Sequence, residues 1–216
     1  RGMCDGPILH IVRHHKPDMV FILYTTEMWD HDKNDDKMCW TINRLCEDMN
    51  HKCDTEIVLT GIDKPHILDE SAVILKHKIH EIYEKYPNDE YILNLTSGTP
   101  QIGAVLRLIA ITGNKKITAL EVSTPEDKAN IHNVVRNGKY DKIEEYGSNI
   151  DNQNSVNRCR VTDIKEFRKT MLVSQIIQAV ESYNYISAFD LADADALGTI
   201  DKTGSLYAHL ENVKDR

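Results

Sequence analysis

The stretch Asn94-Leu95-Thr96-Ser97-Gly98-Thr99-Pro100-Gln101 decides the fold of this chain. It follows the apolar run Tyr91-Ile92-Leu93, which predicts a buried strand, and it precedes residues 102–111, which are apolar apart from Arg107 and predict a buried helix. Thr99 fits the N-cap of that helix, and Pro100 fits its first position. A polar turn between a strand and a helix lies at the carboxyl edge of an α/β sheet, where such folds bind their ligands.

Two interpretations of this turn stay open at this point. The free N–H groups of a first helical turn, with three hydroxyls beside them, can bind a phosphate or another polar oxygen. A well-capped buried helix needs the same residues and no ligand, and an SGT turn alone does not separate the two.

The rest of the first half alternates between short apolar runs and longer periodic segments. Apolar runs at residues 19–24, 55–59, 91–93 and 117–122 predict strands, and residues 30–49, 66–86 and 102–111 predict the helices between them. This alternation predicts an α/β fold with a Rossmann-like, doubly wound parallel sheet. The chain opens with a helix that starts at Pro7 and ends before Pro17, and no strand precedes it. We therefore expect the natural protein to begin earlier, with a first strand upstream.

In a parallel sheet the turns that follow the strands lie at one edge. The turns at residues 25–27, 60–62, 96–101 and 121–125 should therefore line a common crevice. The candidate ligand-binding residues are the small or hydrogen-bonding ones within these turns: Thr25, Thr26, Thr60, Gly61, Thr96, Ser97, Gly98, Thr99, Gln101 and Ser123.

The second half has a different pattern. Residues 137–157 are rich in Asn, Asp, Gly and Ser with mixed charge, which predicts a loop or domain boundary. From residue 158 to 216 the apolar period is helical only, with a helical hairpin that turns near Tyr183-Asn184. We therefore predict a sheet domain over residues 1–136, a boundary over 137–157 and the start of an all-helical domain over 158–216.

Composition limits the function. The chain has 26 Lys and Arg against 34 Asp and Glu, a net charge of −8, whereas proteins that grip long nucleic acids carry a basic face. The five cysteines lack a disulfide framework and favour a reducing cytoplasm. No run of eighteen apolar residues occurs, and no signal peptide opens the chain, so we expect no membrane contact. The spacing of Cys39, Cys46 and Cys53 is better explained by helix packing than by a metal site, and no metal or cofactor is expected.

Three longer strings point to a family. DGPILHIVRHHKP, YILNLTSGTPQIGA and NRC…FRKTMLVSQII resemble the type III-A CRISPR-associated ribonuclease of the Csm family, over essentially the whole chain. The resemblance implies a CARF (CRISPR-associated Rossmann fold) domain, a homodimer that binds cyclic oligoadenylate, and a C-terminal HEPN domain that cuts single-stranded RNA when the ring binds. It also implies that some members cleave the ring slowly. Thr96, Ser97, Gly98, Thr99 and Gln101 match the family's ligand turn, and residues 1–5 match the tail of its first phosphate-facing loop.

The resemblance leaves the catalytic residues outside this sequence. A HEPN site needs Arg and His separated by four to six residues, and the pair that fits, Arg44 and His51, falls in a helix of the sheet domain. We therefore assign no catalytic residue here and leave open whether this chain is itself an enzyme.

Two other functional classes fit the sequence less well. A CARF-type transcription regulator would place basic residues in the tail, which instead carries Asp190, Asp193, Asp195 and Asp201. DNA is therefore not an expected partner. A mononucleotide-dependent metabolic enzyme would usually carry G-x-G-x-x-G, which is missing here.

Overall fold

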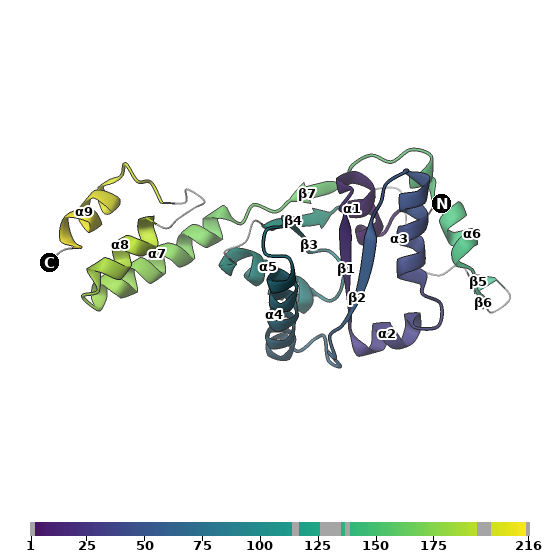
Figure 1. The fold of residues 1–216 in the computed structure, drawn as a ribbon, viewed down its shortest axis with the longest axis horizontal. Coiled ribbons are helices and arrows are strands. Elements are labelled where there is room, and N and C mark those ends of the chain that lie inside the picture. The colour runs from purple at the N-terminus through teal and green to yellow at the C-terminus, as the bar shows by residue number, and fades with distance from the viewer. Residues whose placement is uncertain (1–2, 114–116, 126–134, 137–138, 194–199, 215–216) are drawn as a thin grey trace. The chain divides into compact units, whose positions relative to one another are not determined.

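The computed structural model describes residues 3–113, 117–125, 135–136, 139–193 and 200–214 (Figure 1). The chain forms two compact units. The first comprises residues 1–110 and 114–162, and the second comprises residues 111–113 and 163–216. The first unit begins with α1 (Pro7–His15), β1 (Met19–Tyr24), α2 (Thr26–Asp32), α3 (Lys37–Asp48), β2 (Asp54–Leu59), α4 (Leu68–Lys85), β3 (Tyr91–Asn94), α5 (Pro100–Thr112) and β4 (Ile117–Val122).

The first four strands, β1 to β4, pair in parallel, as the α/β alternation predicts. β1 pairs with β2 from Met19–Asp54 to Tyr24–Leu59, and β3 pairs with β4 from Tyr91–Ile117 to Asn94–Leu120. Among the described residues these pairs are separate ladders. All four strands are followed by the polar turns that the sequence singled out.

Helices cover the strands from both sides, which is the layering of a doubly wound sheet. On β1, Ile22 and Tyr24 pack in one cluster with residues of α1 and α3. The intervening Leu23 packs instead against a cluster of α4 and α5 that contains Leu75 and Val105. This alternation follows from the period-two geometry of a strand. α1 also contacts β3 and β4, so it joins the two ladders on its side.

The predicted helix over residues 30–49 is two helices. α2 ends at Asp32, and α3 begins at Lys37 after Asp36, whose φ of 46° lies in the left-handed region. Asp32 caps the new helix, because its carboxylate accepts the N–H groups of Lys37 at 2.8 Å and Met38 at 3.3 Å. The apolar period continues through the break. The break has a sequence signal of its own, the run of Asn and Asp before Lys37, because these residues favour caps and turns.

Residues 137–157 also differ from the expected loop. They contain β6 (Lys139–Tyr140), which pairs with β5 (Val135–Arg136), then α6 (Lys142–Gly147) and a 3₁₀ turn at Ile150–Asn152. Tyr146 is buried in the cluster of α1, β1 and α3. The polar composition misled the prediction because several of these polar side chains bond one another inside the fold. This segment therefore belongs structurally to the first unit.

A further strand was missed at the start of the region expected to be only helical. β7 (Cys159–Val161) pairs antiparallel with the end of β4, with Glu121 opposite Arg160. Three residues give too short a pattern to show a period of two. The pairing places residues 159–161 beside the predicted ligand edge.

The second unit is helical, as expected. It contains α7 (Lys165–Glu181), α8 (Tyr185–Asp193) and α9 (Ser205–Val213). The predicted hairpin turns at Tyr183, whose φ is 58°, and Asn184 caps α8 by accepting the N–H of Ser187 at 3.1 Å. The core of this unit consists of Ile176, Ala188, Ala192, Ile200 and Leu210.

Candidate functional site

The turn after β3 is held by its own side chains. Asn94 donates through Nδ2 to the Ser97 hydroxyl at 2.6 Å and accepts the Thr96 N–H at 3.0 Å, which forms an Asx turn. Gly98 has a φ of 89°, a conformation that residues with a Cβ rarely adopt. The turn is therefore a defined platform rather than a loose loop.

Thr99 begins α5 as the sequence predicts. Its hydroxyl accepts the N–H of Ile102 at 3.3 Å and donates to the carbonyl of Pro65 at 2.8 Å. These two bonds use the hydroxyl for capping and for tying the turn to the segment that follows β2. Gln101 lies in the first turn of the same helix and is half-buried.

The turns after β1 and β2 are joined to each other. Thr25 caps α2, with the Met28 N–H 3.4 Å from its hydroxyl, and the Thr26 N–H donates to the Ile62 carbonyl at 3.1 Å. Thr60 is buried, and its hydroxyl donates to the Tyr24 carbonyl at 2.7 Å. That hydroxyl thus fastens the ends of the two strands together. Gly61, with a φ of 72°, is exposed beside it.

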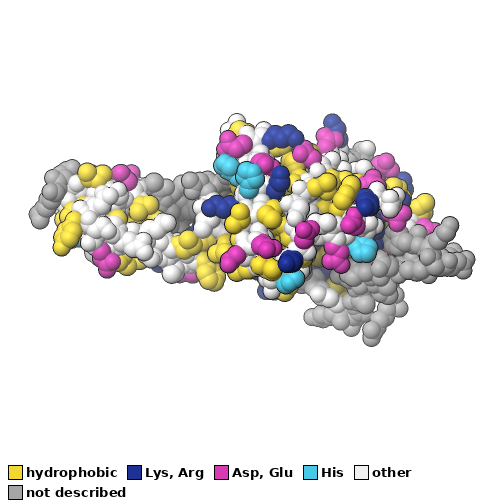
Figure 2. All heavy atoms as spheres, turned by 90° about the horizontal axis from the view of Figure 1, so that it is seen from below, with side chains coloured by type: hydrophobic (Ala, Val, Ile, Leu, Met, Phe, Trp, Pro, Cys, Tyr) yellow, Lys and Arg dark blue, Asp and Glu magenta, His cyan; other side chains and the backbone are white. Residues whose placement is uncertain are grey.

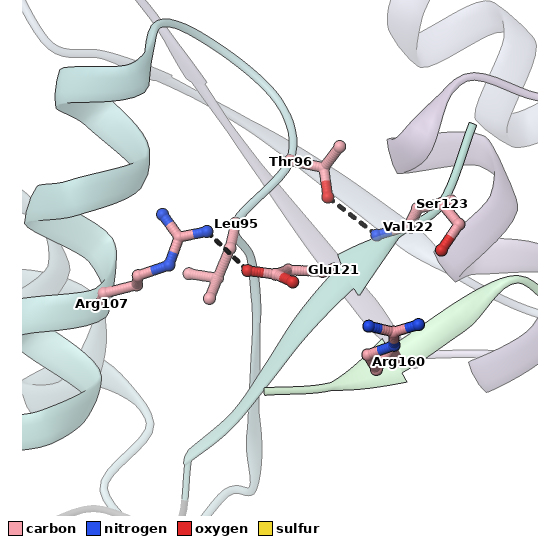
Figure 3. Close-up of a pocket in the computed structure, with 7 residues that line it drawn as sticks. All are labelled: Leu95, Thr96, Arg107, Glu121, Val122, Ser123 and Arg160. Atoms are coloured by element: carbon pink, nitrogen blue, oxygen red, sulfur yellow. Dashed lines mark hydrogen bonds and ion pairs between the residues drawn. The ribbon is translucent and has the colours of Figure 1, made fainter. Parts of the chain in front are cut away.

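A hollow of about 310 Å³ opens where β3 and β4 end (Figure 3). It is lined by Leu95, Thr96, Arg107, Glu121, Val122, Ser123 and Arg160. Thr96 and Ser123 were predicted ligand residues, and the other five were not. The sequence contains only weak indications that these residues belong to a site. Arg107 is a single charge in an apolar helix, and Glu121 is a single charge in an apolar strand.

Two contacts tie the predicted residues to the neighbouring strands. The Thr96 hydroxyl accepts the Val122 N–H at 2.8 Å, which joins the β3 turn to the end of β4. Ser123 is held by Arg158 at both main-chain groups: its N–H donates to the Arg158 carbonyl at 3.1 Å, and its carbonyl accepts from Arg158 Nη1 at 2.8 Å. The position of Ser123 therefore depends on the residue that precedes β7.

Arg158 also belongs to a buried polar cluster that the sequence did not reveal. Asp5, His10 and Asp151 are buried, with ligand atoms close enough to suggest a metal site. The Asp5 carboxylate, however, accepts from Arg13 Nε at 2.6 Å and Nη2 at 3.0 Å. Asp151 accepts the Asp5 N–H at 2.8 Å and lies 3.2 Å from Arg158 Nη2. Two guanidinium groups thus supply the positive charge, and an ion-pair network explains the cluster.

The network lowers the pKa of Asp5 to about 2. Burial raises this pKa, but hydrogen bonds from His10 and Arg13 and the charge of Arg13 lower it by more. Residues 1–5 were expected to be the tail of a phosphate-facing loop. Residues 1 and 2 lie outside the described residues, and Asp5 points into the network.

The other residues that the sequence pattern brings into question have structural partners. Arg44 forms ion pairs with Glu47 at 3.3 Å and Asp48 at 2.7 Å, and His51 Nε2 lies 2.9 Å from the Pro17 carbonyl. His77 and His80 are exposed beside Glu81 and Glu84 on α4. Burial raises the pKa of the Cys53 thiol to about 12, aided by the neighbouring Cys46, so this thiol is poorly suited to bind a metal as a thiolate.

The face drawn in Figure 2 is mixed in charge. On the face in Figure 2, acidic and basic side chains are interspersed with apolar ones rather than gathered by sign. Within the described ranges, none of the helices combines the length and the apolar character needed to cross a bilayer. The hollow of Figure 3 has two arginines and one glutamate among its seven lining residues, so its charged side chains carry a net positive charge.

Known proteins resemble this chain in sequence and in structure. Residues 54–159 match the family model of the Cas_Csm6 CARF domain. The CRISPR system endoribonuclease Csm6 of Enterococcus italicus is 30% identical over 190 residues, which cover 87% of this chain and 44% of that protein. The Csm6 endoribonuclease of Mycobacterium tuberculosis is 28% identical over 190 residues, which cover 87% of this chain and 45% of that protein.

A solved structure agrees with these matches. Enterococcus italicus Csm6 bound to cyclic hexa-2'-fluoro-hexa-dAMP superposes with a TM-score of 0.73 at 26% identity, over 98% of this chain and 50% of that one. The chain spans about half the length of the curated relatives it matches.

Proposed function

Because this chain is related to the Csm6 endoribonucleases of CRISPR systems and carries sequence of their CARF domain, we propose that it is the cyclic-oligoadenylate-sensing part of such a ribonuclease. The ligand is a ring of adenylates joined by phosphodiesters. The observation that carries the proposal is the polar hollow at the ends of β3 and β4, in a fold that matches a structure solved with a cyclic hexa-adenylate analogue.

The proposal includes the partner and the output. Two copies of the chain bind one ring, because a ring with rotational symmetry offers matching groups to both halves of a two-fold dimer. In the full-length protein, ring binding activates cleavage of single-stranded RNA in a defence response. A transcription regulator is not favoured, because the described part of the second unit is a set of helices without the strands of a winged helix.

Titration calorimetry tests the sensing role. The chain is titrated with cyclic tetra-adenylate, cyclic hexa-adenylate and linear hexa-adenylate. We expect one ring to bind at least ten times more tightly than the linear strand, at about one ring per two chains, because the ring is already closed for binding. Absence of binding for both rings at millimolar concentration would refute the proposal.

Light scattering tests the dimer separately. The mass of the chain is measured with and without the ring that binds. We expect a dimer in the presence of the ring. A monomeric mass at every concentration, with the ring bound, would contradict the two-fold arrangement while leaving ligand sensing intact.

A further inference from the structure

The hollow of Figure 3 is organised around charged side chains from three different elements. Arg107 comes from α5, Glu121 from β4 and Arg160 from β7. Arg107 Nη2 donates to Glu121 Oε1 at 2.5 Å, and about 40% of each side chain is exposed. This ion pair is open to solvent, so a ligand that enters the hollow can reach it.

Arg160 lies on the same side of the strands as Glu121. The two residues are opposite each other in the antiparallel register of β7 and β4, and opposed residues share a face. Arg160 is exposed, and within the described ranges its guanidinium has neither an ion-pair nor a hydrogen-bond partner. A cation at the wall of a hollow with its donors unused is suited to bind an anion.

The charge balance of the hollow supports an anionic ligand. Two guanidinium groups face one carboxylate, whereas the whole chain has a net charge of −8. The neutral part of the lining adds the hydroxyls of Thr96 and Ser123. An anion in the hollow would therefore be bound by these few donors alone. A single phosphodiester of a larger ligand fits such a site.

The turn that the sequence emphasised is less available for this task. The Thr99 hydroxyl already donates to the Pro65 carbonyl and accepts the Ile102 N–H. The Ser97 hydroxyl accepts from Asn94 and, within the described part of the chain, keeps its O–H for a ligand. Arg160, in contrast, has all its guanidinium donors unused among the residues that the structure describes, and a guanidinium matches a phosphate with two parallel hydrogen bonds. The unused donors therefore favour Arg160, rather than the start of α5, as the group that binds the phosphate.

We propose that Arg160 is the phosphate-binding residue of this site, that Arg107 supports it, and that Glu121 holds Arg107 in place while opposing the ligand's charge. The proposal rests on the proposed function, since it takes a phosphodiester of cyclic oligoadenylate as the anion. In this proposal the phosphate is bound by two guanidinium groups, whereas the sequence pattern predicted binding by hydroxyls and by the N–H groups of a helix start.

The substitutions have opposite expected effects. Arg160→Ala should weaken ring binding at least tenfold, and Arg160→Lys should weaken it less, because a point charge replaces a bidentate donor. Glu121→Gln should tighten binding severalfold, since the amide still accepts from Arg107 while the charge that repels the phosphate is removed. Arg160→Ala should also make the dependence of log affinity on log salt less steep by about one.

The control is Arg44→Ala, which removes one positive charge from an exposed ion pair on α3, outside the hollow. Calorimetry is repeated at two salt concentrations, and melting temperatures report folding. If the parent binds a ring and Arg160→Ala binds it like Arg44→Ala, the phosphate role is wrong and the sensing role stands. If the parent binds no ring, the proposed function itself fails. If Arg160→Ala has a lower melting temperature than the parent, the variant Arg160→Gln, which keeps a long polar side chain at this exposed position, is measured instead. An affinity of Arg160→Gln for the ring equal to that of the parent would overturn the proposal.

Discussion

Thr96 shows how one side chain can serve both the fold and the site. Its hydroxyl accepts the N–H of buried Val122 at 2.8 Å and also lines the hollow. Without that hydroxyl the Val122 N–H loses its partner, and a buried donor left unsatisfied is costly. Replacement here therefore affects stability as well as ligand contact.

We predict that Thr96→Val lowers the free energy of unfolding by about 1 kcal/mol. Thr96→Ser keeps the acceptor oxygen and should unfold like the parent. Urea denaturation measures both, and His77→Ala serves as a surface control because its ring is 71% exposed. Equal stability of Thr96→Val and the parent would show that the bond to Val122 contributes nothing.

Asp5 links stability to pH. Its pKa in the folded protein, about 2, lies below the usual value of 3.8. A carboxyl with a lowered folded-state pKa stabilises the fold above its usual pKa, and this contribution is lost as pH falls toward the folded-state value. The groups that face it are His10, Arg13, Asp151 and Asn149.

We predict that the Asp5 contribution, about 2 kcal/mol at neutral pH, disappears between about pH 4 and pH 2. Asp5→Asn should therefore be clearly less stable than the parent at neutral pH and close to it at about pH 2. Denaturant unfolding at both pH values measures the difference. Asp30→Asn is the matched control, since it breaks an exposed pair with Lys33. A difference that is independent of pH would contradict the assignment.

At the scale of elements, α5 connects the sheet core to the ligand edge. Its inner side packs Val105 into the cluster with Leu75, and Arg107 reaches Glu121 on β4. The helix start is fixed by Thr99, whose carbonyl also accepts the Gly103 N–H at 3.1 Å. Thr99 thus caps the first turn of α5 through its hydroxyl and its carbonyl.

We predict that Thr99→Ala costs about 1 kcal/mol of stability through the lost cap, and that it also loosens the contact with Pro65. The amide of Ile102, which donates to the Thr99 hydroxyl, should exchange its hydrogen faster, while amides in the middle of α4 should not change. Hydrogen exchange followed by NMR reads each amide separately. Thr99→Ser should restore slow exchange, and unchanged exchange of Ile102 in Thr99→Ala would count against the capping role.

At the scale of the whole molecule, Arg44 and His51, the pair with the spacing of a HEPN site, do not form a common site. Arg44 is engaged by Glu47 and Asp48, and His51 by the Pro17 carbonyl, so neither faces a shared reaction centre. The arrangement explains these two residues as structural.

We predict that the 216-residue chain does not cleave labelled single-stranded RNA, with or without cyclic tetra- or hexa-adenylate. Gel electrophoresis of the RNA after incubation provides the measurement. Cleavage that disappears in Arg44→Ala or His51→Ala would assign a catalytic role to this pair. Lys52→Ala, which removes a neighbouring positive charge, is the control.

The sequence by itself determined the α/β class, the four parallel strands, the turn after β3 and the family resemblance. These depend on local patterns: apolar periodicity, a Thr-Pro helix start and turn residues act between near neighbours. The strands at Met19–Tyr24 and Ile117–Val122 agree with the apolar runs residue for residue. The predicted capping role of Thr99 is confirmed as well, because a cap depends only on residues within one turn of the helix start.

Only the tertiary structure decided which charged residues share a site. Asp5 meets Asp151 across 146 positions of sequence, and Arg107, Glu121 and Arg160 meet because a three-residue strand pairs with β4. Such contacts are set by the register of distant segments, which no local pattern encodes. The polar composition of residues 137–157 hid a buried network for the same physical reason: a charged side chain looks solvent-facing until its partner from elsewhere in the chain is known.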